Sequence, residues 1–264
     1  KRTPCEEAHD LALEAYSAKT PKQSVLMAQR ALEIDPDCAE AYIVLDNNLS
    51  NDPLMTINYM EKAIRAGEKK LGDQFFKDNT GHFWGMLETR SYMRALHHKA
   101  MALWECRRQS EAIEVCWKLL KLNPNDNQGI RYILIDYLLT DNRFKEIKKL
   151  LELYPHEWSA HWHYATTLYY FKTEGAESKE LIQHFKKAIE ANPFILKYLT
   201  AKLKIPSGNP SRYSPGSKEE AICYIQDSVT SWLGTPGVLN WLAGQDVLIE
   251  SKTKKKKTPR GKGH

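Results

Sequence analysis

Hydrophobic and polar residues alternate along most of the chain with the period of amphipathic α-helices. Four stretches close in the same way, with small or aliphatic residues on one side of a helix followed by Asp-Pro, Asn-Pro or Gly. The residue before a proline disfavours helical backbone angles, so these closings predict helix ends. The four stretches are residues 29–36, 61–67, 118–124 and 186–193.

A second helix precedes each closing, which defines a repeating helix pair. Counted back from Pro124, one unit of about 34 residues begins at Met93 and places Ala100 and Ala112 where two helices approach closely. These small residues resemble those of the tetratricopeptide repeat (TPR). The resemblance implies an all-α, right-handed superhelical solenoid of TPR-like helix pairs with C-terminal capping helices. The units that we assign are 5–38, 39–67, 93–126, 127–158 and 159–195.

Two segments interrupt the repeat and set the predicted domain boundaries. Residues 68–92, which are aromatic and flanked by glycines, are predicted to form a loop, and residues 204–216 form a second loop rich in proline, glycine and serine. Beyond it, Ser217 starts a capping-box helix and Thr235-Pro236 starts another short helix. The predicted domains are TPR-like repeats at 1–203 with an irregular insertion at 68–92, capping helices at 204–250, and a disordered basic tail at 251–264.

Longer strings narrow the resemblance to particular families. The strings QRALEIDPDCAEAYIVL, EKAIRAG and KKAIEANPFILKYL, with a closing EEAICY pattern, resemble the soluble repeat region of the suppressor-of-tumorigenicity family. The string GHFWGMLETRSYMRA is similar to a group of uncharacterised TPR proteins. The first likeness covers most of residues 20–245 in patches and departs from the family at 68–92. It implies the fold and a scaffold role, and it brings no enzyme activity that transfers to this chain.

Charge is concentrated at the C-terminal end. The whole chain carries a net charge of +5, and subtracting the seven basic residues from position 252 onward leaves −2 for the rest. Such a polycationic tail is typical of a nuclear address or of non-specific phosphate contact. A nucleic-acid-associated or nuclear adaptor is therefore the alternative function, acting through the tail alone. The tail residues that we assign to it are Lys254, Lys255, Lys256, Lys257 and Arg260.

Recognisable catalytic chemistry is missing from the sequence. It contains no G-x-S-x-G, no glycine-rich phosphate loop and no H-E-x-x-H, so we predict a protein that is not an enzyme and needs no cofactor. His161 and His163 lie two residues apart, point in different directions on a helix and have no third ligand nearby, so no metal site is predicted. Five scattered cysteines indicate free thiols, and no stretch is apolar enough to span a bilayer. We predict a cytoplasmic protein, with the nucleus as a second location.

The remaining candidate is the concave face of the repeats, lined by the first helix of each unit. The resemblance places the second, fifth and ninth residues of each unit there. Arg94 and Arg131 at these positions would present guanidinium forks to a carboxylate, so an acidic protein or peptide partner is expected; the alternative is that both are ordinary solvated arginines. The predicted partner-binding residues are Asn47, Arg94, His97, Arg131 and His163, among the wider set Glu40, Ile43, Met101, Gln128, Ile135, Ala160 and Thr167.

Two aromatic residues of the irregular segment have two interpretations. Phe83 and Trp84 would either anchor a partner or plug a gap between units two and three. The plug is favoured, because a solenoid interrupted there has apolar surface to bury. Chaperone-binding TPR proteins hold a terminal carboxylate with lysines and asparagines in this groove. At the matching positions this chain has His9, Leu13 and Val44. The sequence therefore predicts a protein-interaction scaffold other than a heat-shock-protein adaptor.

Overall fold

The computed structural model describes residues 2–208 and 210–245, which form two compact units that divide between Leu134 and Ile135. In these ranges the regular structure consists of α-helices and short 3₁₀ helices, and no β-strand occurs. The all-α class predicted from the sequence is confirmed. In the same ranges every helix is too short or too polar to cross a bilayer, as predicted.

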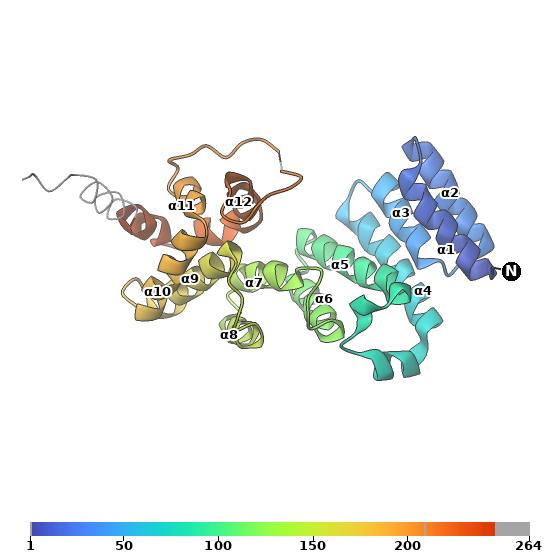
Figure 1. The fold of residues 1–264 in the computed structure, drawn as a ribbon, viewed down its shortest axis with the longest axis horizontal. Helices are drawn as coiled ribbons and strands as arrows, with labels where there is room; N and C mark the ends of the chain where they lie inside the picture. Colours follow the sequence, from blue (N-terminus) through green and yellow to red (C-terminus); the bar gives the residue numbers. More distant parts are fainter. Residues whose placement is uncertain (1, 209, 246–264) are drawn as a thin grey trace, which may run out of the picture. The chain divides into compact units, whose positions relative to one another are not determined.

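In the first unit, consecutive helices pack against each other as pairs (Figure 1). The first helix of each pair also contacts the first helix of the next, α1 with α3 and α3 with α5, which is the TPR arrangement. We call α1, α3 and α5 the first helices of this unit. Its helices are α1 (Pro4–Glu14), α2 (Pro21–Ile34), α3 (Ala39–Leu49), α4 (Pro53–Asn79), α5 (Arg90–Glu105) and α6 (Gln109–Leu122).

Three of these helices start with the same chemistry. Thr3, Thr20 and Asp52 are extended N-cap residues whose side chains accept hydrogen bonds from backbone N–H groups of the first turn. A proline follows each cap, at a position where a missing N–H has no consequence. Local sequence alone therefore fixes where α1, α2 and α4 begin.

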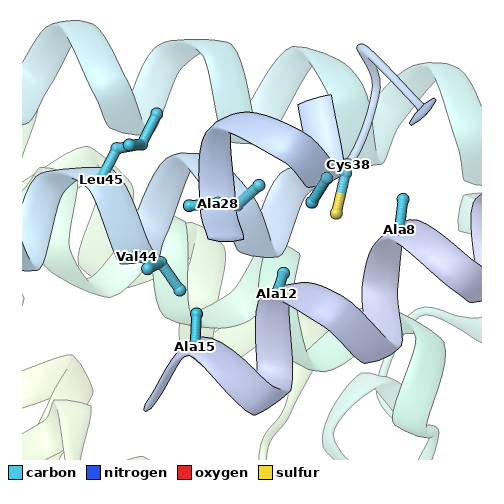
Figure 2. Close-up of a cluster of buried hydrophobic side chains, with 9 residues drawn as sticks. Ala8, Ala12, Ala15, Ala28, Cys38, Val44 and Leu45 are labelled. Atoms are coloured by element: carbon cyan, nitrogen blue, oxygen red, sulfur yellow. The ribbon is translucent and has the colours of Figure 1, made fainter. Parts of the chain in front are cut away.

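Alanines let the two helices of a pair, α1 and α2, approach closely. Figure 2 shows the cluster at the start of the chain, where Ala8, Ala12 and Ala15 meet Ala28 across α1 and α2. Cys38, Val44 and Leu45 close the cluster from the side of α3, and all these side chains are buried. Small side chains at this crossing leave no room for longer ones, so the packing here depends on the alanines.

The same packing is predicted at α5 and α6, where Ala100 and Ala112 are both fully buried. We expect Ala100→Leu to overpack this pair and to lower the free energy of unfolding by about 1–3 kcal/mol in urea denaturation. The control is Met101→Leu, which replaces the exposed neighbouring residue by one of similar volume. We expect it to change the free energy of unfolding by less than about 0.5 kcal/mol. Equal stability of the two variants would show that the assigned repeat register is wrong.

The irregular segment is more helical than predicted. α4 runs on to Asn79, with a kink at Gly72, whose φ of 75° suits a residue without a side chain. Two 3₁₀ helices, Phe83–Gly85 and Leu87–Thr89, then lead into α5. The loop prediction for 68–92 is therefore wrong for the residues of α4, because a kink at a glycine lets the helix turn and continue.

The second unit contains the remaining helices (Figure 1). The division between the units falls within α7. Ser217 caps α12 as predicted, because its side chain accepts a hydrogen bond from the Glu220 N–H. The Glu220 carboxylate accepts hydrogen bonds from Gly216 N and Asn192 Nδ2, rather than from the Ser217 N–H as a capping box requires. The helices are α7 (Ile130–Thr140), α8 (Phe144–Leu153), α9 (Ala160–Glu174), α10 (Lys179–Ala191), α11 (Pro193–Leu199), α12 (Lys218–Leu233) and a helix at 238–245.

The start of the last helix differs from the prediction. The helix begins at Val238 rather than at Pro236. The Thr235 hydroxyl donates back to the carbonyl of Ser231 at 2.7 Å, so its side chain bonds the end of α12. A threonine can bond the preceding turn as well as the following one, and here the end of α12 takes it.

Candidate functional site

The first helices of the first unit line a hollow of about 380 Å³. It shares Leu13, Glu40 and Arg94 with a larger cavity of about 630 Å³ on one side. It shares His98 with a hollow of about 430 Å³ that reaches Met101. We call this continuous surface the inner face. Its central residues are Leu13, Tyr16, Glu40, Ile43, Asn47, Arg94 and His98.

Large apolar side chains are exposed on the inner face. Leu13 is 42% exposed, Tyr16 51% and Met101 44%. They come from α1, from the short 3₁₀ helix Ala15–Ser17 that follows it, and from α5. Exposed apolar side chains scattered singly are ordinary, whereas several along one concave surface are typical of a binding site.

A buried carboxylate organises the polar part of the inner face. Glu40 is fully buried and accepts hydrogen bonds from the Tyr16 hydroxyl at 2.7 Å and from the Ser91 hydroxyl at 2.5 Å. Arg94 Nη2 donates to the same carboxylate. Tyr16, Ser91 and Arg94 come from parts of the chain that lie far from Glu40 in sequence, so this network ties α3 and α5 to the 3₁₀ helix that follows α1.

The network also sets the charge of Glu40. Burial by itself would raise the pKa of Glu40, but the hydrogen bond from Ser91 and the charge of Arg94 outweigh it, and the pKa is lowered. Burial, followed by the charge of Glu40, raises the pKa of Tyr16. Burial lowers the pKa of the neighbouring His9. At neutral pH Glu40 is therefore ionised, and its carboxylate is fixed by a phenol, a hydroxyl and a guanidinium.

The two predicted arginines are both engaged within the first unit. Arg94 is about one-third exposed, and its charge is neutralised by the ion pair with Glu40. Arg131 Nη1 lies 2.9 Å from the buried Asp126 carboxylate, and its guanidinium stacks on the Tyr132 ring at 4.4 Å. Neither interpretation weighed above fits fully, since these arginines are held by carboxylates of their own chain.

Of the three other predicted partner-binding residues, Asn47 lies on the inner face, as do Glu40, Ile43 and Met101 of the wider set. His97 is largely buried, and burial followed by the nearby His98 lowers its pKa to about 4, so it is neutral. His163 is buried, 5.8 Å from the His184 ring between α9 and α10. Asn47 and Arg94 thus lie together on the inner face, whereas His97 is largely buried within the first unit and His163 is buried within the second.

The aromatic pair of the irregular segment is mostly internal. Phe83 is fully buried and its ring lies 5.0 Å from Phe76 and 6.2 Å from Tyr92. Trp84 is partly buried, with the Arg90 guanidinium 5.5 Å from its ring. This is the arrangement expected of a plug. The basic tail residues Lys254–Lys257 and Arg260 lie outside the described residues.

Sequence reasoning missed Tyr16, Glu40 as an organising group, and His98. Leu13 could have indicated the apolar part of this surface. It is the ninth residue of the first repeat, 5–38, and an apolar residue at a groove position predicts an apolar surface. No local signal marks Glu40, whose partners Ser91 and Arg94 are 51 and 54 residues away.

Comparison with known proteins identifies the family. A family model described as "ST7 protein" matches residues 3–246. The chain belongs to the ST7 family. Among curated ST7-family proteins, the Protein ST7 homolog of Drosophila melanogaster is 24% identical over 89% of this chain and 48% of that protein. The Suppressor of tumorigenicity 7 protein-like of Rattus norvegicus is 23% identical over 86% of this chain and 44% of that protein. This ST7-family chain therefore spans about half the length of these relatives.

A solved structure supports the TPR architecture of this ST7-family chain. The crystal structure titled "YrrB: a TPR protein with an unusual peptide-binding site" superposes with a TM-score of 0.51 at 17% identity. The match covers 75% of this chain and 91% of that one. At this identity the likeness concerns the fold alone.

In the second unit of this ST7-family chain, a helix covers the corresponding first helices, α7 and α9. Residues 162–168 of α9 are all buried, which leaves no open side over nearly two turns. α12 packs here through Tyr224, whose ring lies 5.6 Å from Tyr164, and through Ser231, whose hydroxyl is 2.7 Å from that of Thr140. The open inner face is therefore a feature of the first unit.

Proposed function

We propose that this chain is a non-enzymatic protein-interaction module that binds a peptide segment of a partner protein on the inner face of its first unit. The observation that carries the proposal is the exposed apolar surface of the inner face. Exposed apolar side chains of α1 and α5 flank a polar centre that Glu40 holds in place. The printed title of the TPR neighbour names a peptide-binding site in that protein, which supports the same kind of ligand here.

The chemistry of the inner face favours apolar contact as the source of affinity. Leu13, Tyr16 and Met101 offer the exposed apolar area, and Asn47 offers an amide that can bond a peptide backbone. Arg94 is already neutralised by Glu40, so a general preference for acidic partners has less support than the sequence suggested. The exposed part of Arg94 therefore serves to orient a bound peptide more than to attract it by charge.

The cytoplasm or the nucleus is the compartment that we propose for this module. Cys38 and Cys116 are buried, and all the cysteines of the chain are free thiols. Burial raises the pKa of Cys38 to about 11, so this thiol stays protonated and unreactive. Such thiols are typical of a reducing compartment.

Selection from a displayed peptide library against the full chain tests the proposal. We expect selected peptides to lose affinity by about tenfold for Leu13→Ala and for Tyr16→Ala, because each change removes apolar contact at the centre of the surface. Tyr16→Phe should bind nearly normally, since it keeps the ring. The measurement is fluorescence anisotropy with a selected peptide.

The matched control is Leu26→Ala, which removes a leucine from the second helix α2 that is more exposed than Leu13, 56% against 42%. If Leu26→Ala weakens binding as much as Leu13→Ala and Tyr16→Ala do, the peptide does not bind on the inner face. Selection of no peptide at all would also contradict the proposed function.

A further inference from the structure

Several serines and threonines of the chain directly precede a proline, and such dipeptides are what proline-directed protein kinases modify. In the part of the chain that the structure describes, these dipeptides begin at Thr3, Thr20, Ser214 and Thr235. One more, at Thr258, lies outside the described residues. The dipeptide is the same in every case, so the surroundings of each hydroxyl decide which of them a kinase can reach.

Three of the four described hydroxyls are occupied by the chain itself. Thr3 and Thr20 are N-caps, whose hydroxyl oxygens accept from backbone N–H groups at 3.3 and 3.2 Å. Thr235 is buried, and its hydroxyl donates to a backbone carbonyl of α12 at 2.7 Å. A kinase holds its substrate as an extended chain, but α1 and α2 begin directly after Thr3 and Thr20. Phosphorylation of these three residues therefore requires local unfolding.

Ser214 differs in each of these respects. It is exposed, and its hydroxyl forms no hydrogen bond with another described residue. Residues 212–214 have no regular secondary structure, and a residue before a proline favours the extended backbone. α12 begins only at Lys218. The turn in which the Ser217 N–H donates to the Ser214 carbonyl at 3.1 Å has to open when a kinase binds, whereas α12 does not have to unfold.

The charge of the surrounding segment suits a phosphate. Residues 192–218 contain no aspartate or glutamate. Arg212 precedes Ser214 by two residues and Lys218 follows it by four, so both can approach a phosphate on Ser214. The basic residues of the segment are Lys197, Lys202, Lys204, Arg212 and Lys218. These five charges give the segment +5, and a phosphate of nearly two negative charges lowers this to about +3.

We propose that the fold exposes Ser214, among these four residues, to phosphorylation by a proline-directed serine/threonine kinase with ATP. The Ser214 Oγ forms a bond to the γ-phosphorus as the bond from that phosphorus to the bridging oxygen of ADP breaks. The hydroxyl proton passes to the base of the kinase, and ADP leaves. Ser214 belongs to the second unit, so the inference does not depend on the peptide binding proposed for the first unit.

Phosphorylation of the full chain by a purified kinase of the mitogen-activated class tests the proposal. The chain carries Thr258→Ala, so that every remaining Ser-Pro or Thr-Pro is a described one, and Thr20→Ser, so that two sites offer the same acceptor. Peptide mass spectrometry then gives the rate at each position. We expect residue 20 to react about tenfold or more slowly than Ser214, because it has to leave a helix cap first. Equal rates at the two positions, or no phosphate on Ser214, would overturn the proposal.

Two variants separate the dipeptide from exposure alone. Pro215→Ala should slow phosphorylation of Ser214 by about tenfold, since a kinase site built for proline leaves a backbone N–H unpaired. Ser211→Ala changes another exposed serine, one that precedes Arg212, and should leave the rate at Ser214 unchanged. An unchanged rate for Pro215→Ala would overturn the assignment to a proline-directed kinase.

Synthetic peptides separate the fold from the local sequence. One peptide covers residues 16–24 with Thr20→Ser, and the other covers residues 210–218, so that each has its serine at the centre. We expect the same kinase to phosphorylate the two peptides at rates within about threefold, because neither forms a helix cap at this length. A difference between the peptides as large as that in the folded chain would show that sequence selects Ser214 and the fold does not, and the proposal would fall.

Discussion

Glu40→Ala is expected to lower the free energy of unfolding of the first unit by about 3 kcal/mol. The change leaves Arg94 without its carboxylate and removes the acceptor shared by Tyr16 and Ser91. Breaking a buried ion pair typically costs about 3–5 kcal/mol, and the lower end applies because Arg94 is partly exposed. Urea denaturation followed by circular dichroism gives the measurement.

The control for this variant is Glu33→Ala, which breaks the exposed ion pair with Arg30. Exposed pairs contribute little, so this variant should stay within about 1 kcal/mol of the parent. Similar losses for the two variants would mean that Glu40 does not organise the inner face.

The same residue predicts how stability changes in acid. The pKa of Glu40 is lowered in the folded state, so the unfolded chain binds the proton more readily. The stability that ionised Glu40 contributes is present above the ordinary value of 4.5 and is lost as the pH falls through the folded pKa. Glu40→Gln should therefore start less stable at neutral pH and lose less stability below about pH 4.5 than the parent. Parallel curves for the two proteins would contradict this assignment.

Trp232→Ala is expected to destabilise the second unit by about 3–5 kcal/mol. Trp232 is fully buried, its ring lies 6.4 Å from Tyr164, and its indole N–H bonds the Tyr224 hydroxyl. Truncation leaves a cavity under α12 and removes one hydrogen-bond partner of the buried Tyr224 hydroxyl. Near-ultraviolet circular dichroism during urea denaturation reports the loss of this packing.

The neighbouring Leu233 is exposed and supplies a matched control. Leu233→Ala shortens the next side chain of the same helix, and we expect a change of less than about 0.5 kcal/mol. A small effect of Trp232→Ala would mean that α12 does not cover α7 and α9 firmly, and the comparison drawn between the two units would lose its basis.

The sequence predicts local features of this protein well. Helix ends before Pro36, Pro124 and Pro193 follow from backbone sterics, and they coincide with the ends of α2, α6 and α10. The small residues Ala100 and Ala112 are buried as the repeat requires. Each of these features depends on neighbours within one helix pair, which periodicity can capture.

Features that depend on distant partners could not be predicted. The groove position of Arg94 follows from the repeat, but its neutralisation requires Glu40, which lies 54 residues earlier. His163 also fits a groove position, yet it is buried with its ring 5.8 Å from that of His184 of α10, while α12, which follows the long loop after α11, packs on Tyr164 of α9. A single sequence does not reveal which segment folds back over an earlier face, because that depends on tertiary packing.

Methyl-labelled methionine offers the most direct test of the central claim, that the inner face of the first unit binds the partner. Met101 is exposed on the inner face, whereas Met27 lies on the second helix α2 and Met55 on the second helix α4. Carbon-13 methyl NMR of the full chain, with and without a selected peptide, reads all three in one spectrum. We predict that the Met101 signal shifts on binding while those of Met27 and Met55 stay in place. Shifts of Met27 or Met55 with an unchanged Met101 would contradict the claim.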